Sequence, residues 1–131
     1  QYYSLDLLDF FTKKKVYKHI NSIGQQIKNG WLTLSKKYDI ELTVSENNSL
    51  CSFFLNYKNN QELYTFFSKK MLENNIIASN SIYVSYSHKK KDIIEYLKIC
   101  DHVFNKMSTF IKKKKKLKKC NIRYSGFKRL T

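Results

Sequence analysis

Residues 40–57 read IELTVSENNSLCSFFLNY, and this stretch decides the fold. Apolar and polar side chains alternate over residues 40–44, which is the period-two pattern of a half-buried strand. Polar residues 46–49 supply a turn, and residues 50–57 are apolar enough to form a second, more buried strand. The stretch therefore predicts two sheet strands joined by a short turn.

Helical patterns flank these strands on both sides. Apolar residues recur at three- and four-residue spacing over residues 16–38, 63–71 and 93–111, which predicts three amphipathic helices. A shorter stripe over residues 5–11 predicts a separate first helix. Gly24 and Gly30 weaken the helix that contains them, so their presence suggests close packing against a neighbouring element.

The middle of the chain carries the remaining strands. The helix around residues 63–71 should stop at Asn74 and Asn75, because Asn tolerates the left-handed backbone of a helix cap. Residues 76–77 and 82–86 then predict two short strands. The result is an α+β fold, a small, mostly antiparallel sheet of about three to four strands covered by long helices on one face. We expect residues 1–111 to form one α+β domain, followed by a Lys-rich helix end and an irregular tail over 112–131.

Charge is the strongest compositional signal. The chain has 25 Lys and Arg against 10 Asp and Glu, a net charge of +15, and such an excess of cations favours nucleic acid as a partner. Only Arg123 and Arg129 are arginine, the side chain best suited to phosphate and guanine. Two interpretations of the lysine run stay open. It is a solvated helix end, or the chain is a free-standing basic α+β module that binds nucleic acid through Lys112, Lys113, Lys115, Lys116 and Lys119.

Catalytic and metal-binding patterns are weak. His19, His88 and His102 lie at no helical spacing from one another or from a Cys that would suit a metal. Cys51 and Cys100 fall on predicted core positions, where a thiol acts as a small hydrophobe. With three glycines there is no phosphate-binding loop. We predict no metal site and no catalytic residue in this chain.

The cysteines and the apolar runs of the chain indicate the cellular environment that we expect for it. The three cysteines match no disulfide framework, which favours a reducing, cytoplasmic environment. The longest nearly apolar run, residues 50–55, is far shorter than the roughly 20 residues of a membrane span. We therefore expect no membrane partner.

Residues 78–88 read ASNSIYVSYSH and hold the densest group of small polar side chains. A polar loop that enters a strand can present hydroxyl and amide groups to a ligand. The same groups can instead bond to their own backbone. Both interpretations stay open for Ser79, Asn80 and Ser81.

Five stretches together carry a family resemblance: residues 19–31, 67–78 (FSKKMLENNIIA), 79–88, the helix that begins at 92, and 125–130 (SGFKRL). In these stretches the chain resembles the small C-terminal domain of class III aminotransferases, which depend on pyridoxal phosphate. Within that class it is most similar to the glutamate-1-semialdehyde 2,1-aminomutases. It departs from the family pattern at Asn74 and Asn75, at Ser87 and at Lys89.

The resemblance implies a fold-type I homodimer in which an upstream large domain of the same polypeptide binds pyridoxal phosphate through a lysine. The chain starts at Gln1, and we expect it to be a piece of that longer enzyme, inactive alone. The C-terminal domain would close over the pocket of a small-molecule amino substrate and contribute to dimer packing. Ser79, Asn80 and Ser81 are the residues expected to line that pocket.

Overall fold

The central strand of the sheet is β2 (Leu50–Leu55), and it pairs antiparallel with β1 (Leu42–Val44) and β3 (Ser81–Tyr83). Val44 lies opposite Phe53, and Cys51 lies opposite Ile82. This computed structural model describes residues 2–130, with side chains over 7–117. Within these residues the sheet has three strands, which confirms the predicted small antiparallel sheet.

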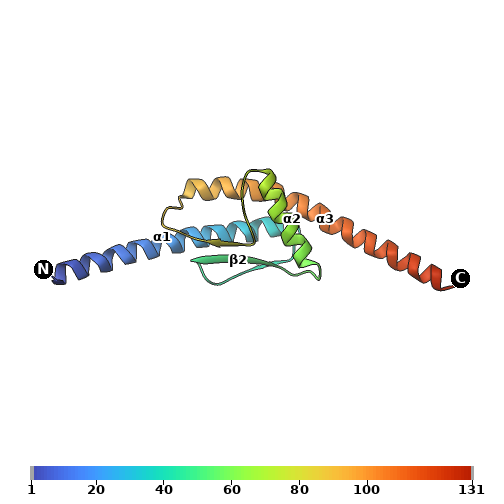
Figure 1. Cartoon of the computed structure of the whole chain (residues 1–131), viewed down its shortest axis with the longest axis horizontal. Helices are drawn as coiled ribbons and strands as arrows, with labels where there is room; N and C mark the ends of the chain where they lie inside the picture. The colour runs from blue at the N-terminus through green and yellow to red at the C-terminus, as the bar shows by residue number, and fades with distance from the viewer. Residues whose placement is uncertain (1, 131) are drawn as a thin grey trace.

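Three helices form a layer on one side of the sheet (Figure 1): α1 (Tyr2–Lys37), α2 (Asn60–Glu73) and α3 (Lys90–Leu130). Alternation along β2 decides which face they cover, since Cys51, Phe53 and Leu55 are buried while Phe54 is 45 % exposed. The α+β class and the helices on one face are therefore confirmed.

Aromatic rings from every layer meet at Phe53, which is fully buried. Its ring centroid lies 4.9 Å from that of Trp31 in α1, 5.0 Å from Phe67 in α2 and 5.9 Å from Phe104 in α3. These pairs take edge-to-face geometries, which are favourable for aromatic rings. The core therefore forms where the predicted apolar stripes of the three helices converge on β2.

The two long helices lie side by side and run in the same direction, since residues 30, 31 and 37 of α1 meet residues 97, 96 and 101 of α3. Gly30 faces the Leu97 side chain, at 2.5 Å from where a Cβ would be. Gly24 faces the backbone of Asn48 in the β1–β2 turn, at 2.0 Å. The close packing predicted for both glycines is confirmed.

The chain leaves α1 through Asp39 and leaves α2 through Asn75, and both residues have a left-handed backbone conformation. Asn75 has φ 64°, the amide of Ile76 donates to the carbonyl of Met71 at 3.0 Å, and that of Asn75 donates to Leu72 at 2.9 Å. This is a Schellman cap, and it confirms that α2 stops at the asparagine pair. It also shows that the predicted strand at residues 76–77 is wrong, because the amide of Ile76 is used by the cap.

Asp92 is the first acidic residue of α3, and it contacts the backbone at the start of the helix. The carboxylate of Asp92 accepts a hydrogen bond at 3.1 Å from the backbone amide of Lys89, just before the helix begins. Such a contact satisfies an amide that has no partner inside the helix and places negative charge at the positive end of the helix dipole. Asp92 therefore stabilises the start of α3.

The chain ends differ from the sequence prediction. A single helix spans residues 2–37 where two were expected, and α3 continues to Leu130 where a Lys-rich helix end and then an irregular tail were expected over 112–131. Helix α1 extends past the sheet at its N-terminal end, and α3 extends past it at its C-terminal end (Figure 1). The division of the chain into a domain over 1–111 and a tail stays a prediction. Within the described residues, no helix has an apolar stretch that meets the length needed to cross a bilayer.

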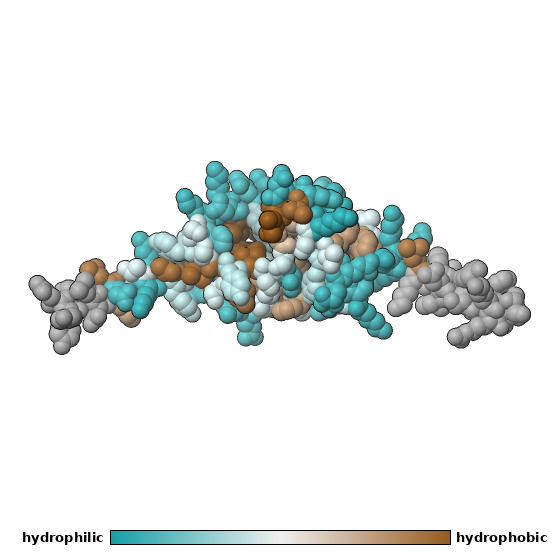
Figure 2. Space-filling model, in the orientation of Figure 1, coloured by the Kyte–Doolittle hydropathy of each residue, from teal (hydrophilic) through white to brown (hydrophobic). Residues whose placement is uncertain are grey.

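The N-terminal part of α1 carries large apolar side chains that no described element covers. Leu7, Leu8, Phe10 and Phe11 are 56 to 64 % exposed. Figure 2 shows hydrophobic surface at this end of the molecule, next to the grey residues, whereas much of the opposite end is hydrophilic. We call these four residues the α1 apolar arm.

Candidate functional site

The predicted pocket residues lie at the edge where β3 joins β2. The side-chain amide of Asn80 donates to the carbonyl of Phe53 at 2.9 Å, and the Phe53 amide donates to the Asn80 carbonyl at the same distance. The hydroxyl of Ser81 bonds to that of Ser52 at 2.8 Å, and Ser79 bonds to the backbone of Ser81 at 3.3 Å. The structure thus brings the three residues together through bonds that hold the strand edge, and their role toward a substrate stays a prediction.

A surface groove of about 640 Å³ lies beside this segment, between α2 and residues 77–78. We call it the α2 groove. Leu72 and Ile77 supply its most exposed apolar side chains, at 59 and 95 %, and Lys69 supplies a cation. Tyr64 also lines it, while its hydroxyl accepts a hydrogen bond at 3.1 Å from the amide of Leu55. Sequence reasoning missed this groove because it assigned residues 76–77 to a strand.

The structure brings His19 and His88 together from α1 and the loop before α3. The Nε2 atom of His19 is 2.6 Å from the carbonyl oxygen of His88, and the Tyr86 ring packs edge-on against His19 at 5.1 Å. The Nδ1 atom of His88 accepts a hydrogen bond from the amide of Ser85 at 3.0 Å. These contacts hold the loop before α3 against α1. Among the described residues, no cluster of three metal-binding side chains occurs.

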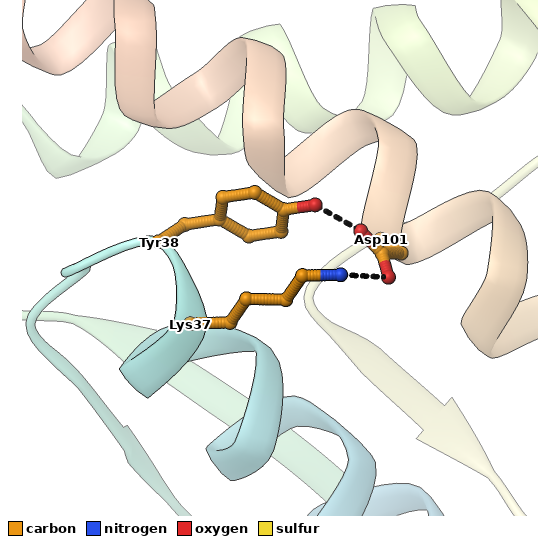
Figure 3. A network of polar contacts seen from close by, with 3 residues as sticks. All are labelled: Lys37, Tyr38 and Asp101. Atoms are coloured by element: carbon orange, nitrogen blue, oxygen red, sulfur yellow. Dashed lines mark hydrogen bonds and ion pairs between the residues drawn. The ribbon is translucent and has the colours of Figure 1, made fainter.

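A polar network joins the C-terminal end of α1 to α3 (Figure 3). The carboxylate of Asp101 accepts a hydrogen bond from the Tyr38 hydroxyl. It also forms an ion pair with the amine of Lys37 at 2.9 Å. The hydrogen bond from Lys37, and then that from Tyr38, lowers the pKa of Asp101, while the bond to Asp101 raises the pKa of Lys37 and of Tyr38. No sequence signal pointed to this network, because Asp101 is more than 60 residues from both Lys37 and Tyr38.

Both described cysteines are buried core residues. Cys51 contacts the backbone of Gly24 and Asn48, and burial raises the pKa of its thiol. Burial raises the pKa of the Cys100 thiol to about 12. A thiol with a raised pKa is a poor nucleophile at neutral pH, so the expectation that both act as small hydrophobes is confirmed.

The described residues do not form a site for pyridoxal phosphate. Such a site needs a reachable lysine amine and a carboxylate for the pyridine nitrogen. Lys28 is buried, but its amine donates to the backbone carbonyl of Glu46 at 2.9 Å. Of the described carboxylates that line a groove, Glu62 pairs with Lys114 at 2.9 Å, and Asp92 and Glu95 line a groove that holds no lysine. We therefore derive no catalytic step from this chain.

The lysine run lies on α3 beyond the core. Lys112, Lys113, Lys115 and Lys116 are exposed, and the side chain of Lys119 lies outside the described residues. A second groove, of about 450 Å³, lies between the start of α2 and this part of α3. We call it the α3 groove. It brings Lys114 and Lys115 close to Tyr57, which sequence reasoning did not connect with the run.

Comparison with known proteins identifies the fold. No protein-family model matches the chain. A solved transaminase with pyridoxal phosphate bound is similar over 70 % of this chain, with a TM-score of 0.64 and 19 % identity. The FumI protein of Sphingopyxis sp. MTA144, solved in its pyridoxal-phosphate internal aldimine form, is similar over 68 %, with a TM-score of 0.62 and 15 % identity.

The chain corresponds to only part of each of these proteins, 23 % of the transaminase chain and 22 % of the FumI chain. A fold like that of this chain therefore also occurs as a segment of much longer proteins whose structures hold pyridoxal phosphate. Over about two thirds of its length, this chain has the fold of a transaminase segment.

Proposed function

We propose that the chain is the small C-terminal domain of an aminotransferase or aminomutase that uses pyridoxal phosphate. The observation that carries the proposal is the similarity of more than two thirds of the chain to about one fifth of two transaminase structures. The sequence resemblance to class III aminotransferases is independent support. In this proposal the chain encloses the substrate and contributes to dimer packing, while the rest of the polypeptide performs the chemistry.

The α1 apolar arm supports attachment to a further part of the same polypeptide. Its four side chains project from a helix whose other half is packed in the core, and contiguous exposed apolar surface of this kind is typical of an interface. A large domain that precedes this chain would cover the arm. The proposed homodimer would place a second copy nearby.

Substrate enclosure would fall to the edge of the sheet and the α2 groove. Ser79, Asn80 and Ser81 lie at one end of β3, and Ala78 connects them to the groove. An apolar groove with a single lysine suits an amino substrate that also has an acidic group. For the parent enzyme we propose a glutamate-1-semialdehyde-type substrate and a cytoplasmic location.

Pyridoxal phosphate, when bound, supplies the electron sink for amino transfer. In the proposal it is bound by the preceding domain, since the described residues offer no site for it. What this chain contributes is a rigid wall: Asn80 is bonded to β2 in both directions, so the segment can exclude water without moving.

The reading frame that encodes this chain provides the test. We expect it to encode a longer polypeptide that binds pyridoxal phosphate and transfers an amino group, and we expect the 131-residue chain alone to bind none, as read from the absorbance of the bound cofactor. The proposal fails if the full polypeptide binds no pyridoxal phosphate. It also fails if the isolated chain binds the cofactor and turns over an amino donor.

A further inference from the structure

We propose that the α3 groove binds single-stranded nucleic acid, with a base against Tyr57 and backbone phosphates on Lys58, Lys115 and the adjacent exposed lysines Lys112, Lys113 and Lys116. This inference goes beyond the proposed function and does not depend on it, because it uses none of the residues assigned to substrate enclosure. It rests on the charge, shape and aromatic content of the groove.

Charge in the groove is strongly positive. Lys58, Lys114 and Lys115 line it, and Glu62 is its one acidic residue. Lys114 neutralises that carboxylate at 2.9 Å and lowers its pKa, so the amines of Lys58 and Lys115 remain for an anionic ligand.

The positive charge continues along α3 outside the groove. Lys112, Lys113 and Lys116 are exposed on the same helix. Side chains three or four residues apart on a helix are neighbours, so Lys112 lies near Lys115 and Lys116. A groove that opens into a row of cations suits a chain of phosphates better than a single small anion.

The groove also has a flat aromatic wall and an apolar floor. The hydroxyl of Tyr57 accepts a hydrogen bond from the amide of Glu41 at 2.9 Å, which holds the ring in place. The amine of Lys115 lies 5.8 Å from the centre of that ring. Ile111 and Leu117 complete the lining, and the volume of about 450 Å³ has room for one nucleotide. An aromatic ring beside cations is the usual platform for an unpaired base.

These features favour a single strand over other polyanions. A duplex keeps its base faces stacked inside, so it would gain nothing from Tyr57. An acidic peptide would use the lysines without the ring, and a flat anionic membrane would not enter a groove. Because no arginine lines the groove, we expect binding without base specificity.

Fluorescence anisotropy of a fluorescein-labelled oligo(dT) of twelve nucleotides tests the proposal, using the full 131-residue chain. Replacing both groove lysines (Lys58→Gln with Lys115→Gln) should weaken binding by about tenfold at moderate salt. The matched control, Lys36→Gln with Lys98→Gln, removes the same charge from exposed lysines outside the groove and should change binding less than about twofold.

The aromatic wall is tested separately. Tyr57→Leu should weaken binding by about fivefold, whereas Tyr57→Phe keeps the ring and should stay within about twofold. Circular dichroism of each variant checks that it is folded; if Tyr57→Leu is not, the comparison of the two lysine pairs decides alone.

Three results would overturn the proposal. One is equal weakening by the groove pair and the control pair, since that is the behaviour of any strongly cationic protein. Another is a folded Tyr57→Leu variant that binds as well as Tyr57→Phe. The last is a duplex of the same length, a twelve-residue glutamate peptide or an anionic phosphatidylserine vesicle binding more tightly than oligo(dT).

Discussion

The backbone of Gly24 in α1 lies directly against the backbone of Asn48 in the β1–β2 turn. A Cβ at position 24 would be 2.0 Å from the Asn48 carbonyl oxygen and 2.8 Å from the carbonyl carbon. Backbone atoms cannot rotate away, so helix and turn must separate to admit a methyl group. The helix can therefore approach this turn only because position 24 has no side chain.

We predict that Gly24→Ala destabilises the chain by about 2–3 kcal/mol, although Ala favours a helix by about 1 kcal/mol over Gly. Gly30→Ala is the control, because its Cβ would meet the methyl carbons of Leu97, a half-buried side chain that can turn aside. It should change the free energy of unfolding by less than about 1 kcal/mol. Urea denaturation measures both, and a Gly24→Ala variant as stable as Gly30→Ala would contradict the prediction.

Phe53 and Phe54 test which face of the sheet carries the core. Phe53 is fully buried and makes edge-to-face contacts with three other rings, and its neighbour is 45 % exposed on the opposite face. Phe53→Ala should lower the free energy of unfolding by about 3–5 kcal/mol, because it leaves a cavity and removes three ring contacts. Phe54→Ala should cost less than about 1.5 kcal/mol in the same urea experiment. Similar losses at the two positions would show that β2 is buried on both faces.

The cap of α2 provides a third matched pair of variants. Asn75 has φ 64°, whereas Asn74 has φ −99°. Asn75→Gly should stabilise the chain by about 0.4–1 kcal/mol, since Gly takes the left-handed conformation without strain. Asn74→Gly should instead destabilise it by about 0.5–1 kcal/mol, because it adds flexibility and removes the side-chain bond to the Lys70 carbonyl. Thermal unfolding of the two variants should move in opposite directions, and a shared direction would argue against the cap.

The fold could be predicted wherever a local sequence pattern determines the secondary structure. Alternation over residues 40–44 and three- and four-residue spacing over 16–38 led to the confirmed strands and helix, and the asparagine pair led to the confirmed helix end. The predicted break near the N-terminus was wrong because a loss of apolar periodicity does not end a helix. Residues 12–15 read TKKK and contain neither Gly nor Pro, so the helix continues through them with an exposed surface.

The sites were predictable only in part. Ser79, Asn80 and Ser81 stood out by composition, but their bonds to Phe53 and Ser52 depend on the register of two strands 27 or more residues apart. The lysine run was visible in the sequence, whereas its position beside Tyr57 depends on how α3 packs. Contacts between distant residues that follow no period leave no local signal.

The pairing of Asp101 with Tyr38 and Lys37 predicts how stability depends on pH. The lowered pKa of Asp101 means that its contribution is present above the ordinary Asp value, about 4, and is lost as pH falls through the lower folded value. The raised pKa values of Tyr38 and Lys37 give their contributions to stability the opposite dependence on pH. Their contributions are present below about 10 and are lost as pH rises through the folded values.

We therefore expect Asp101→Asn to be less stable than the natural chain at neutral pH, with the difference in melting temperature shrinking in both acid and alkali. Tyr38→Phe keeps the ion pair of Lys37 with Asp101 and removes only the Tyr38 hydrogen bond, so its deficit should shrink as pH rises through the raised pKa of Tyr38. Because the Lys37 side chain is 55 % exposed and that of Asp101 is 36 % exposed, salt should weaken the Lys37 part of the effect. A melting-temperature difference for Asp101→Asn that stays constant from about pH 3 to about pH 11 would show that the network contributes packing and no electrostatic stabilisation.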